Sequence, residues 1–377
     1  MIYLDHAATT KVCDAAVQAA VERMTVHFGN PSSRHPLGAE AAALLKQDRK
    51  AVADALGCLP EEVYFTSGGT EGNNWAIRAS LQQNRRVGKH IITTGLEHAA
   101  VLEPLKALEQ QGYEVTYLQP AETGNIPVSA VEAALREDTA LVSMMLVNNE
   151  TGVVLPVQEV SRLLRRKKSR ALLHTDAVQG FLKLPFTPKG LGVDLLTISG
   201  HKIHAPRGVG ALYVRRGLRI GPLLRGGGQE NGLRSGTEPT PQIAGFAAAC
   251  TLGKENLQER IAHMQRLKSY AVEKLQAALP QMKVVGQGEA PHILCVSLPG
   301  YKSEVLVRVL GDLGVCVSAG SACHRGKASH VLKQMKLSPR EREGAFRISF
   351  SHESTEEEVN GLCAALVQAA ESIFPAL

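Results

Sequence analysis

The sequence Leu195-Leu196-Thr197-Ile198-Ser199-Gly200-His201-Lys202 is the stretch that decides the fold. Its apolar run, closed at once by a glycine, predicts a buried strand that carries Lys202 to the end of a sheet. Because burial disfavours the charged form of an amine, we expect a lowered pKa and a nucleophilic amine at Lys202. The plainer interpretation is a strand whose terminal lysine simply extends into water.

A nucleophilic lysine amine forms imines with aldehydes, most often with pyridoxal phosphate. A site for this cofactor needs a carboxylate for the pyridinium nitrogen and donors for the phosphate. It also needs a flat group over the ring and a partner for the phenolic oxygen. In an α/β protein these groups come from successive strand ends and helix starts.

Strands and helices alternate along most of the chain. We expect strands at residues 62–66, 90–93, 113–118, 141–147, 171–175, 195–198 and 208–214, and helices at 15–25, 38–56, 69–79, 97–110, 128–135 and 157–165. This order predicts a mainly parallel sheet with helices on both faces and a site at the carboxyl ends of its strands.

Two polar residues next to predicted strands suit the cofactor ring. Asp176 follows the apolar run Ala171-Leu172-Leu173 and can pair with the pyridinium nitrogen. His98 begins a helix and can stack on the ring or move protons. Taken singly, each has a plainer role as a helix cap or a satisfied buried group.

Further polar residues lie near the other strand ends. Asn149 and Gln179 can hydrogen-bond the phenolic oxygen, and Ser199 and His201 can reach the phosphate. A phosphate cup is also predicted in Ser67-Gly68-Gly69-Thr70-Glu71-Gly72-Asn73-Asn74, where Gly69 and Thr70 open a helix. Alone, that segment is equally consistent with an ordinary strand-to-helix turn.

The C-terminal third predicts a second, smaller α+β unit. One long helix over 254–279 leads into it, followed by shorter elements at 293–298, 304–313, 315–318, 345–350 and 355–370. We therefore divide the chain into a large domain (15–258) and a small domain built from both ends (1–14 and 259–377). Within the small domain, Arg347 can clamp a substrate carboxylate.

The loop Ser318-Ala319-Gly320-Ser321-Ala322-Cys323-His324-Arg325-Gly326-Lys327 holds the other reactive candidate. Small and cationic neighbours lower the pKa of a thiol and leave it accessible, which favours a reactive Cys323. An exposed cysteine without a role explains this loop equally well.

Composition excludes several classes of protein. The 42 basic and 36 acidic residues leave a charge of only +6, and aromatic residues make up 4%, so neither direct nucleic-acid binding nor stacking on bases is indicated. No apolar run is long enough to span a bilayer, and the N-terminal sequence lacks a secretion-signal pattern, so we expect a cytoplasmic protein. The seven scattered cysteines contain no C-x-x-C pair, so no metal site is predicted.

The sequence resembles the pyridoxal-phosphate-dependent cysteine desulfurases of the NifS/IscS type, in the class V aminotransferase family. The resemblance rests on Tyr3–Thr10, Phe28–Ser33, Thr66–Glu71, Val147–Glu150, Ser199–Lys202, Arg234–Thr237 and Gly320–Cys323. It implies an aspartate-aminotransferase-like fold, PLP fold type I. It also implies a homodimer with a shared active site, in which Thr237 reaches the phosphate of the partner's cofactor.

The resemblance also implies a reaction. L-cysteine would bind with its carboxylate near Arg347 and Asn30, and also near Asn149, while Lys202 and His98 move protons. The Cys323 thiolate would then take the substrate sulfur as a persulfide and release L-alanine. An iron–sulfur scaffold or a tRNA thiolase would receive the sulfur.

The chain departs from the family pattern in three places. The segment after Cys323 is shorter than in the IscS type, which bears on how far a persulfide can travel. Ala205 and Arg207 stand where the family often has Gly and Lys, and Asn231 replaces a common Arg. None of these changes removes a group that the reaction needs.

Two other functions fit much of the same pattern. A selenocysteine lyase could use the same site with little dependence on a thiol, and a class V transaminase needs no cysteine on the small domain. A partner-binding paralogue without activity would be expected to lack Lys202, Asp176 or Cys323, and all three are present.

Overall fold

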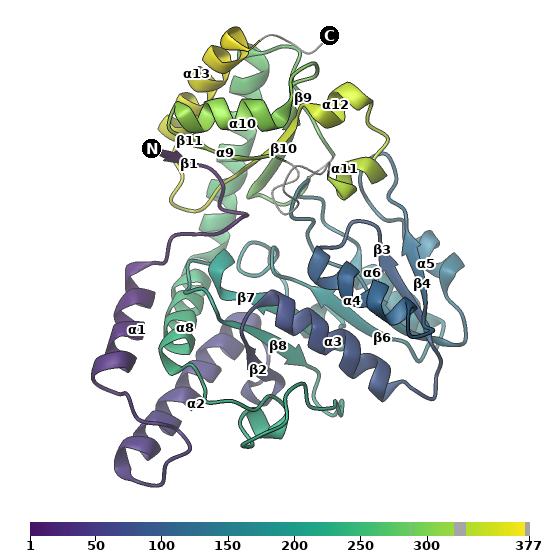
Figure 1. Cartoon of the computed structure of the whole chain (residues 1–377), viewed down its shortest axis with the longest axis vertical. Helices are drawn as coiled ribbons and strands as arrows, with labels where there is room; N and C mark the ends of the chain where they lie inside the picture. The colour runs from purple at the N-terminus through teal and green to yellow at the C-terminus, as the bar shows by residue number, and fades with distance from the viewer. Residues whose placement is uncertain (287, 320–328, 374–377) are drawn as a thin grey trace.

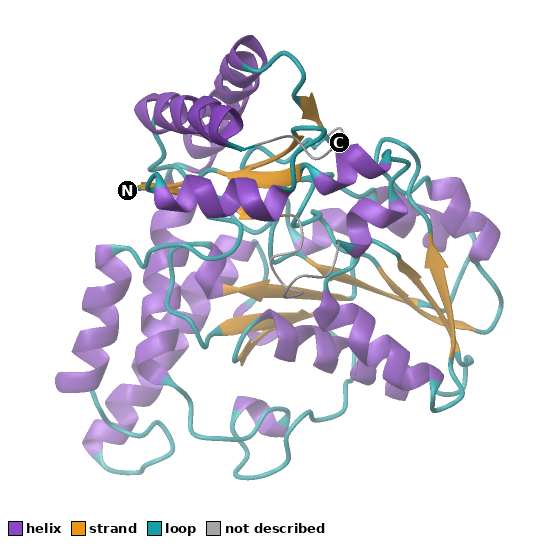
Figure 2. Cartoon of the chain, turned by 45° about the horizontal axis from the view of Figure 1, so that its top comes forward, coloured by secondary structure: helices purple, strands orange, loops and turns teal. Residues whose placement is uncertain are grey.

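The computed structural model describes residues 1–286, 288–319 and 329–373. Its larger part is an α/β layer structure in which helices cover both faces of one sheet (Figures 1 and 2). The strands are β2 (Val63–Thr66), β3 (His90–Thr94), β4 (Glu114–Leu118), β5 (Thr139–Ser143), β6 (Leu172–Asp176), β7 (Leu195–Ser199) and β8 (Gly210–Val214). Around them are α1 (Asp14–Thr25), α2 (Pro36–Leu56), α3 (Gly69–Gln83), α4 (Ala99–Glu109), α5 (Val128–Ala134), α6 (Val157–Arg166), α7 (Pro188–Leu191) and α8 (Thr240–Glu255).

The seven strands pair in the order β2-β8-β7-β6-β5-β3-β4. All pairs from β7 to β4 are parallel, whereas β8 runs antiparallel to both of its neighbours. This confirms the predicted mainly parallel sheet. Since β5, β6 and β7 are parallel, their carboxyl ends lie along one edge, where polar residues from each can meet.

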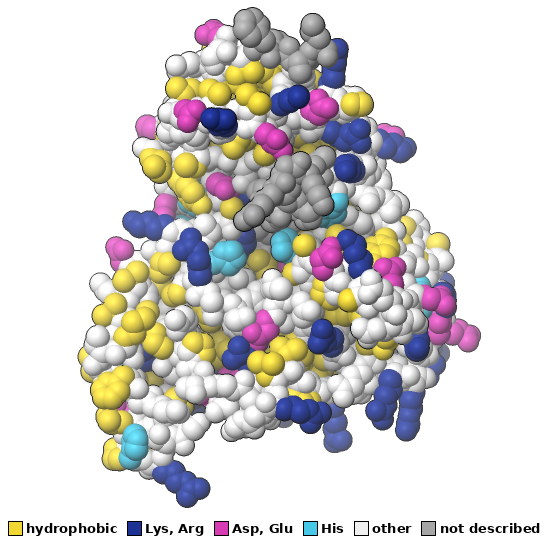
Figure 3. Space-filling view, in the orientation of Figure 1, with side chains coloured by type: hydrophobic (Ala, Val, Ile, Leu, Met, Phe, Trp, Pro, Cys, Tyr) yellow, Lys and Arg dark blue, Asp and Glu magenta, His cyan; other side chains and the backbone are white. Residues whose placement is uncertain are grey.

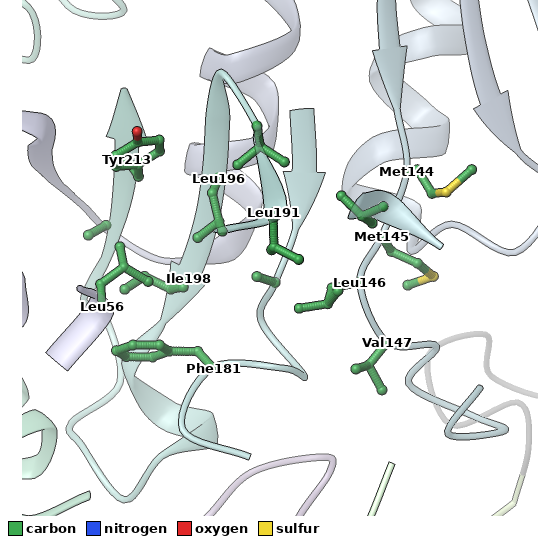
Figure 4. Close-up of a cluster of buried hydrophobic side chains, with 14 of the residues drawn as sticks. Leu56, Met144, Met145, Leu146, Val147, Phe181, Leu191, Leu196, Ile198 and Tyr213 are labelled. Atoms are coloured by element: carbon green, nitrogen blue, oxygen red, sulfur yellow. The ribbon is translucent and has the colours of Figure 1, made fainter. Parts of the chain in front are cut away.

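Strand β7 shows why the deciding stretch is so apolar. Successive side chains point to opposite faces, and both faces are covered. Leu196 and Ile198 pack in one buried cluster with Leu56 and Phe181 (Figure 4). On the other face, a Cβ at Gly72 of α3 would lie only 2.6 Å from Thr197 Cγ2, so α3 lies very close to the strand.

The smaller part contains two further sheets. Strands β12 (Ser318–Ala319), β13 (Ala345–Ser349), β10 (Ile293–Ser297) and β9 (Lys283–Val284) form an antiparallel sheet, and β1 (Ile2–Tyr3) pairs in parallel with β11 (Val315–Cys316). The helices are α9 (Leu257–Ala278), α10 (Ser303–Asp312), α11 (His330–Gln334), α12 (Pro339–Glu343) and α13 (Glu356–Ser372). The described N-terminal strand therefore lies against elements from the last third of the chain (Figure 1).

Of the five buried clusters among the described residues, the two largest account for most of the core of the two parts. The larger one draws on the central sheet and its helices, and the smaller one joins Leu4 to side chains of α9, β10, α10, β13 and α13. Among the described helices, none combines the length and the apolar character that a membrane crossing requires.

Several elements differ from the prediction. The strand expected over 141–147 ends at Ser143, although Met144 and Leu146 still donate backbone hydrogen bonds toward β6. Helix α8 was not predicted, and the helix expected from 254 begins instead at Leu257. Short helices α11 and α12 and strand β9 also went unpredicted, because segments of two to five residues carry too little periodicity.

Candidate functional site

A cavity of about 350 Å³ lies at the carboxyl edge of the sheet. The ends of β6 and β7, the start of α3 and residues of β13 surround it. Most of the predicted site residues line it: Gly69, Thr70, His98, Asn149, Asp176, Gln179, Ser199, His201, Lys202 and Arg347. Ala7 and Arg347 also line it, so residues 340 positions apart in sequence meet in one place.

Lys202 reaches this cavity as the prediction requires. It closes a short 3-10 helix, η2 (Gly200–Lys202), directly after β7. Its Nζ donates hydrogen bonds of 2.6 Å to the carbonyl oxygens of both Ala7 and Ala8. The N-terminal segment thus forms a wall of the cavity and holds the amine at the sheet edge.

Asp176 ends strand β6 and lies at the floor of the cavity with 7% of its surface exposed. Its Oδ2 accepts a 2.6 Å hydrogen bond from Asn73 Nδ2, and its Oδ1 accepts one from the Val178 backbone N–H. The Oδ1 of Asn73 is buried and has no hydrogen-bond partner among the described residues. A carboxylate held this way suits a buried cationic nitrogen.

The start of α3 forms the predicted anion cup. Gly68, with φ of 149°, turns the chain into the helix, and no side chain caps the first free N–H groups. A Cβ on Gly210 would lie 2.9 Å from the Gly68 Cα, so glycine permits this close approach. Free N–H groups at a helix start bind phosphate. With Asp176 and Lys202, this donor set fits pyridoxal phosphate.

His98 is the N-cap of α4, where its Nδ1 accepts a hydrogen bond from the Ala100 N–H. The preceding residue, Glu97, is fully buried, and burial raises the pKa of its carboxyl to about 8. Glu97 Oε1 accepts from Thr94 Oγ1 and from the Met145 N–H, whereas its Oε2 is unpartnered within the described structure. The residue next to His98 in the chain therefore carries a carboxyl that is mainly neutral at pH 7.

His201 and Gln179 are both held by the N-terminal segment. Burial, followed by the nearby charge of Lys202, lowers the pKa of His201 to about 4, so its ring is neutral at pH 7. Gln179 donates through Nε2 to the Ala7 carbonyl, and its Oε1 lies 3.3 Å from His292 Nε2. The Gln179 amide is thus already bonded within the protein at both ends.

Arg347 lies in β13 with 5% of its surface exposed. Its Nη1 donates to the Asn149 carbonyl at 2.7 Å and its Nη2 donates to Asp5 Oδ1 at 2.8 Å. The Nε is buried and lacks a hydrogen-bond partner in the part of the chain that is described. The guanidinium is therefore fixed in direction, and its Nη1 and Nη2 each have a second N–H beyond these two bonds.

Two of the predicted residues that the structure describes are not brought into the cavity. Asn30 is exposed, and its Oδ1 accepts from the Ser32 N–H in a local turn. Thr237 is also exposed, in the loop after η3 (Glu230–Gly232), and does not line this cavity. Cys323 lies outside the described residues.

A larger hollow of about 1000 Å³ lies at the opposite ends of β6 and β7. Its acids are already engaged: Asp194 pairs with Arg215 at 2.7 Å, and buried Glu62 accepts the Leu59 and Arg216 N–H groups. Burial raises the pKa of the Cys58 thiol there to about 12, so this thiol is a poor nucleophile. The predicted site residues line the smaller cavity instead.

Sequence reasoning missed several residues that shape the site. Asp5 orients Arg347, Asn73 orients Asp176, and the carbonyl groups of Ala7 and Ala8 hold Lys202. Their partners are far away in sequence, so no local spacing pairs them. Within the described ranges, no cluster of His, Cys, Asp and Glu suits a metal ion.

Comparisons with known proteins agree with this geometry. Residues 2–362 match the family model for aminotransferase class-V. A cysteine desulfurase from Nostoc sp. is 43% identical over 366 residues, which is 96% of this chain and 90% of the relative. A solved NifS-like protein superposes with a TM-score of 0.93 at 37% identity, covering 99% of this chain and all of the other. SspA in complex with cysteine gives 0.82 at 33% identity, covering 94% of this chain and all of that one.

Proposed function

The chain belongs to the aminotransferase class-V family and is a pyridoxal-phosphate-dependent cysteine desulfurase with PLP fold type I. From this premise we propose that the cavity around Lys202 is its active site and that L-cysteine is its substrate. The observation that carries the proposal is the meeting of Lys202, Asp176, His98 and Arg347 around one cavity. A lysine, a carboxylate, an imidazole and a guanidinium are the groups that this chemistry needs.

The proposed cofactor contacts follow from position. Asp176 would pair with the ring nitrogen, and bound pyridoxal phosphate would supply an electron sink for bond cleavage at the substrate. The free N–H groups of Gly69 and Thr70, with Ser199 and His201, would hold the phosphate. Asn149 and Gln179 would lie near the phenolic oxygen. To bond this oxygen, Gln179 Nε2 would give up its hydrogen bond to the Ala7 carbonyl.

Substrate handling is assigned to the other side of the cavity. Arg347 would bind the cysteine carboxylate through the remaining N–H groups of Nη1 and Nη2, because Asp5 and the Asn149 carbonyl already fix its direction. Asn149 would flank the same carboxylate. Lys202 would move the substrate proton, and His98 would hold or pass it at the opposite face.

Sulfur transfer is assigned by resemblance. The Cys323 thiolate would attack the substrate sulfur, break its bond to carbon and keep the sulfur as a persulfide. The carbon would regain a proton, so that L-alanine leaves. A sulfur-acceptor protein, an iron–sulfur scaffold or a tRNA thiolase, would then take the persulfide sulfur.

A homodimer belongs to the same proposal. Hydrophobic side chains gather over α1 at the lower left of Figure 3, and Val17, Val21, Met24 and Phe28 there are 46 to 65% exposed. A second copy would cover these side chains and bring its Thr237 to this cavity. In that dimer, Asn30 would lie near the substrate.

We also propose that the enzyme acts in the cytoplasm. The location of a tagged chain in cells would test this.

The test is alanine and sulfide release from L-cysteine with a reductant present, for the wild type and for Cys323→Ser. We expect both products from the wild type, and neither with L-cysteine once the thiol is removed. Selenocysteine is assayed in parallel. If Cys323→Ser still released alanine from selenocysteine alone at the wild-type rate, a selenocysteine lyase would explain the site better.

A further inference from the structure

A second lysine lies directly behind Lys202. Lys183 has 6% of its surface exposed, in the turn that follows β6 and carries Gln179. Its Nζ donates a 2.8 Å hydrogen bond to the backbone carbonyl of Lys202. The two amines thus belong to one local structure, one facing the substrate cavity and the other held in the interior.

No carboxylate compensates the Lys183 amine: none of the ion pairs among the described residues includes it. Burial, and then the charges of Lys202 and Arg347, lower its pKa to about 7. It also shares a small cavity of about 30 Å³, large enough for one water, with Lys202, His204, Arg260 and His352.

The groups that face Lys183 from other elements are all basic. Its charge lowers the pKa of histidines from the N-terminal segment, the η2 turn, the following loop and the start of β10, namely His6, His201, His204 and His292. Burial is the first cause of each of these shifts. These imidazoles are therefore neutral near pH 7, and the charges that oppose a proton on Lys183 are those of Lys202 and Arg347.

A buried amine without a counter-charge is costly to the fold. A neutral donor such as glutamine would satisfy the Lys202 carbonyl at lower cost. The feature that only a lysine or arginine adds is a positive charge close to Lys202. A nearby like charge favours loss of the proton from a neighbouring amine.

We propose that Lys183 is a positioning residue for Lys202, which clamps the turn at the Lys202 carbonyl and uses its charge to make the Lys202 nitrogen release its proton more readily. The inference rests on the proposed role of Lys202 as the reacting lysine. Because the two amines are coupled, protonation of one opposes protonation of the other. Lys183 itself does not line the cavity that would hold substrate and cofactor.

The test uses the holoenzyme and the absorbance of its bound cofactor, measured as pH is varied. Lys183→Met removes both charge and donor, whereas Lys183→Gln removes the charge but keeps a donor for the Lys202 carbonyl. We expect the pKa of the absorbance change to rise by about one unit in both variants. Lys189→Met, an exposed lysine six positions along, should leave it unchanged.

The pair of variants separates electrostatics from packing. If the spectral pKa stayed at the wild-type value in both folded variants, the proposal would be overturned. The same holds if Lys183→Met lost thermal stability, Lys183→Gln regained it, and neither shifted the titration, because Lys183 would then be a clamp alone. If the Lys202 assignment itself were wrong, the result would be different: the cofactor would be found attached to another lysine.

Discussion

At the scale of single residues, burial sets the protonation of the groups behind the cavity. Glu97 is an acid kept neutral by burial, and His201 is a base kept neutral by burial and the nearby Lys202. Both lie next to residues that we assign to proton movement or phosphate binding. Among the described residues that line the cavity, the ionisable groups other than histidine are Asp176, Lys202 and Arg347, and Arg347 is paired with Asp5.

Glu97 makes stability depend on pH in a definite direction. Its carboxyl ionises near pH 4.5 when unfolded and near pH 8 when folded, so the folded state holds the extra proton between these values. Stability from this group is therefore lost as pH rises from 4.5 to 8, by up to about 1.4 kcal/mol per pH unit.

Glu97→Gln should remove this loss, because glutamine keeps an acceptor for Thr94 and Met145 without a titrating proton. Urea unfolding of the variant and the wild type at several pH values measures the difference. We expect the variant to gain relative stability steadily between pH 5 and 8. Exposed Glu61→Gln is the control, and parallel pH profiles for Glu97→Gln and the wild type would refute the assignment.

The reacting residues were predictable because each follows an apolar strand or opens a helix in the printed sequence. Lys202, Asp176 and His98 could be identified this way, and all three line the cavity. Asp5, Asn73 and Lys183 could not, since each acts through a hydrogen bond to a residue between 19 and 342 positions away. Local patterns identify groups at element ends but not the partners that orient them.

At the scale of elements, the site depends on the close contact of α3 with β7. Gly72→Ala would place a Cβ 2.6 Å from Thr197 Cγ2, so the helix start must shift. We expect a loss of about 1–3 kcal/mol in the free energy of unfolding and weaker retention of pyridoxal phosphate. Thermal unfolding and cofactor content after dialysis measure both effects.

Gly311→Ala in α10 is the matched control, because no atom lies within 4 Å of the added Cβ. This substitution should stabilise by about 0.4–1 kcal/mol and leave cofactor retention unchanged. Equal effects at the two glycines would argue against a positioning role for α3.

Helix α8 shows why some elements escape prediction. It lies against α1 and α2, and it buries Ile243, Ala244, Gly245, Phe246 and Ala247 in succession. A helix that is apolar on several sides lacks the 3.6-residue alternation on which a sequence-based assignment depends. By contrast, the strands of the central sheet other than β5 were predicted to within about two residues, because their short apolar runs are bounded by glycine and polar residues.

At the scale of the whole molecule, the loop that carries Thr237 is anchored by two ion pairs, and Thr237 is exposed and does not line the cavity of its own subunit. Arg49 binds Glu230 with two 2.7 Å hydrogen bonds, and Arg234 binds Glu71 in the same bidentate manner. A loop anchored twice on its own subunit is suited to present an exposed Thr237 to a neighbour.

The division of the chain into a large domain (15–258) and a small domain (1–14 and 259–377) stays a prediction.

Subunit mixing tests the shared site. If Thr237 serves the partner's cavity, a hybrid of Lys202→Ala and Thr237→Ala subunits contains one site with both groups intact. Refolding the two inactive or weakened variants together should then restore up to half of the activity per hybrid dimer, measured at limiting pyridoxal phosphate. If Thr237 served its own subunit, no hybrid site would be intact and activity would not rise above the sum of the separate variants.

The most direct test of the central assignment is to fix the cofactor covalently. Borohydride reduction of the holoenzyme, followed by peptide mapping by mass spectrometry, identifies the lysine that holds pyridoxal phosphate. The account predicts the added mass on Lys202 in the wild type and in Lys183→Gln, and its absence from Lys202→Ala. Attachment to Lys183, or to a lysine outside this cavity, would contradict it.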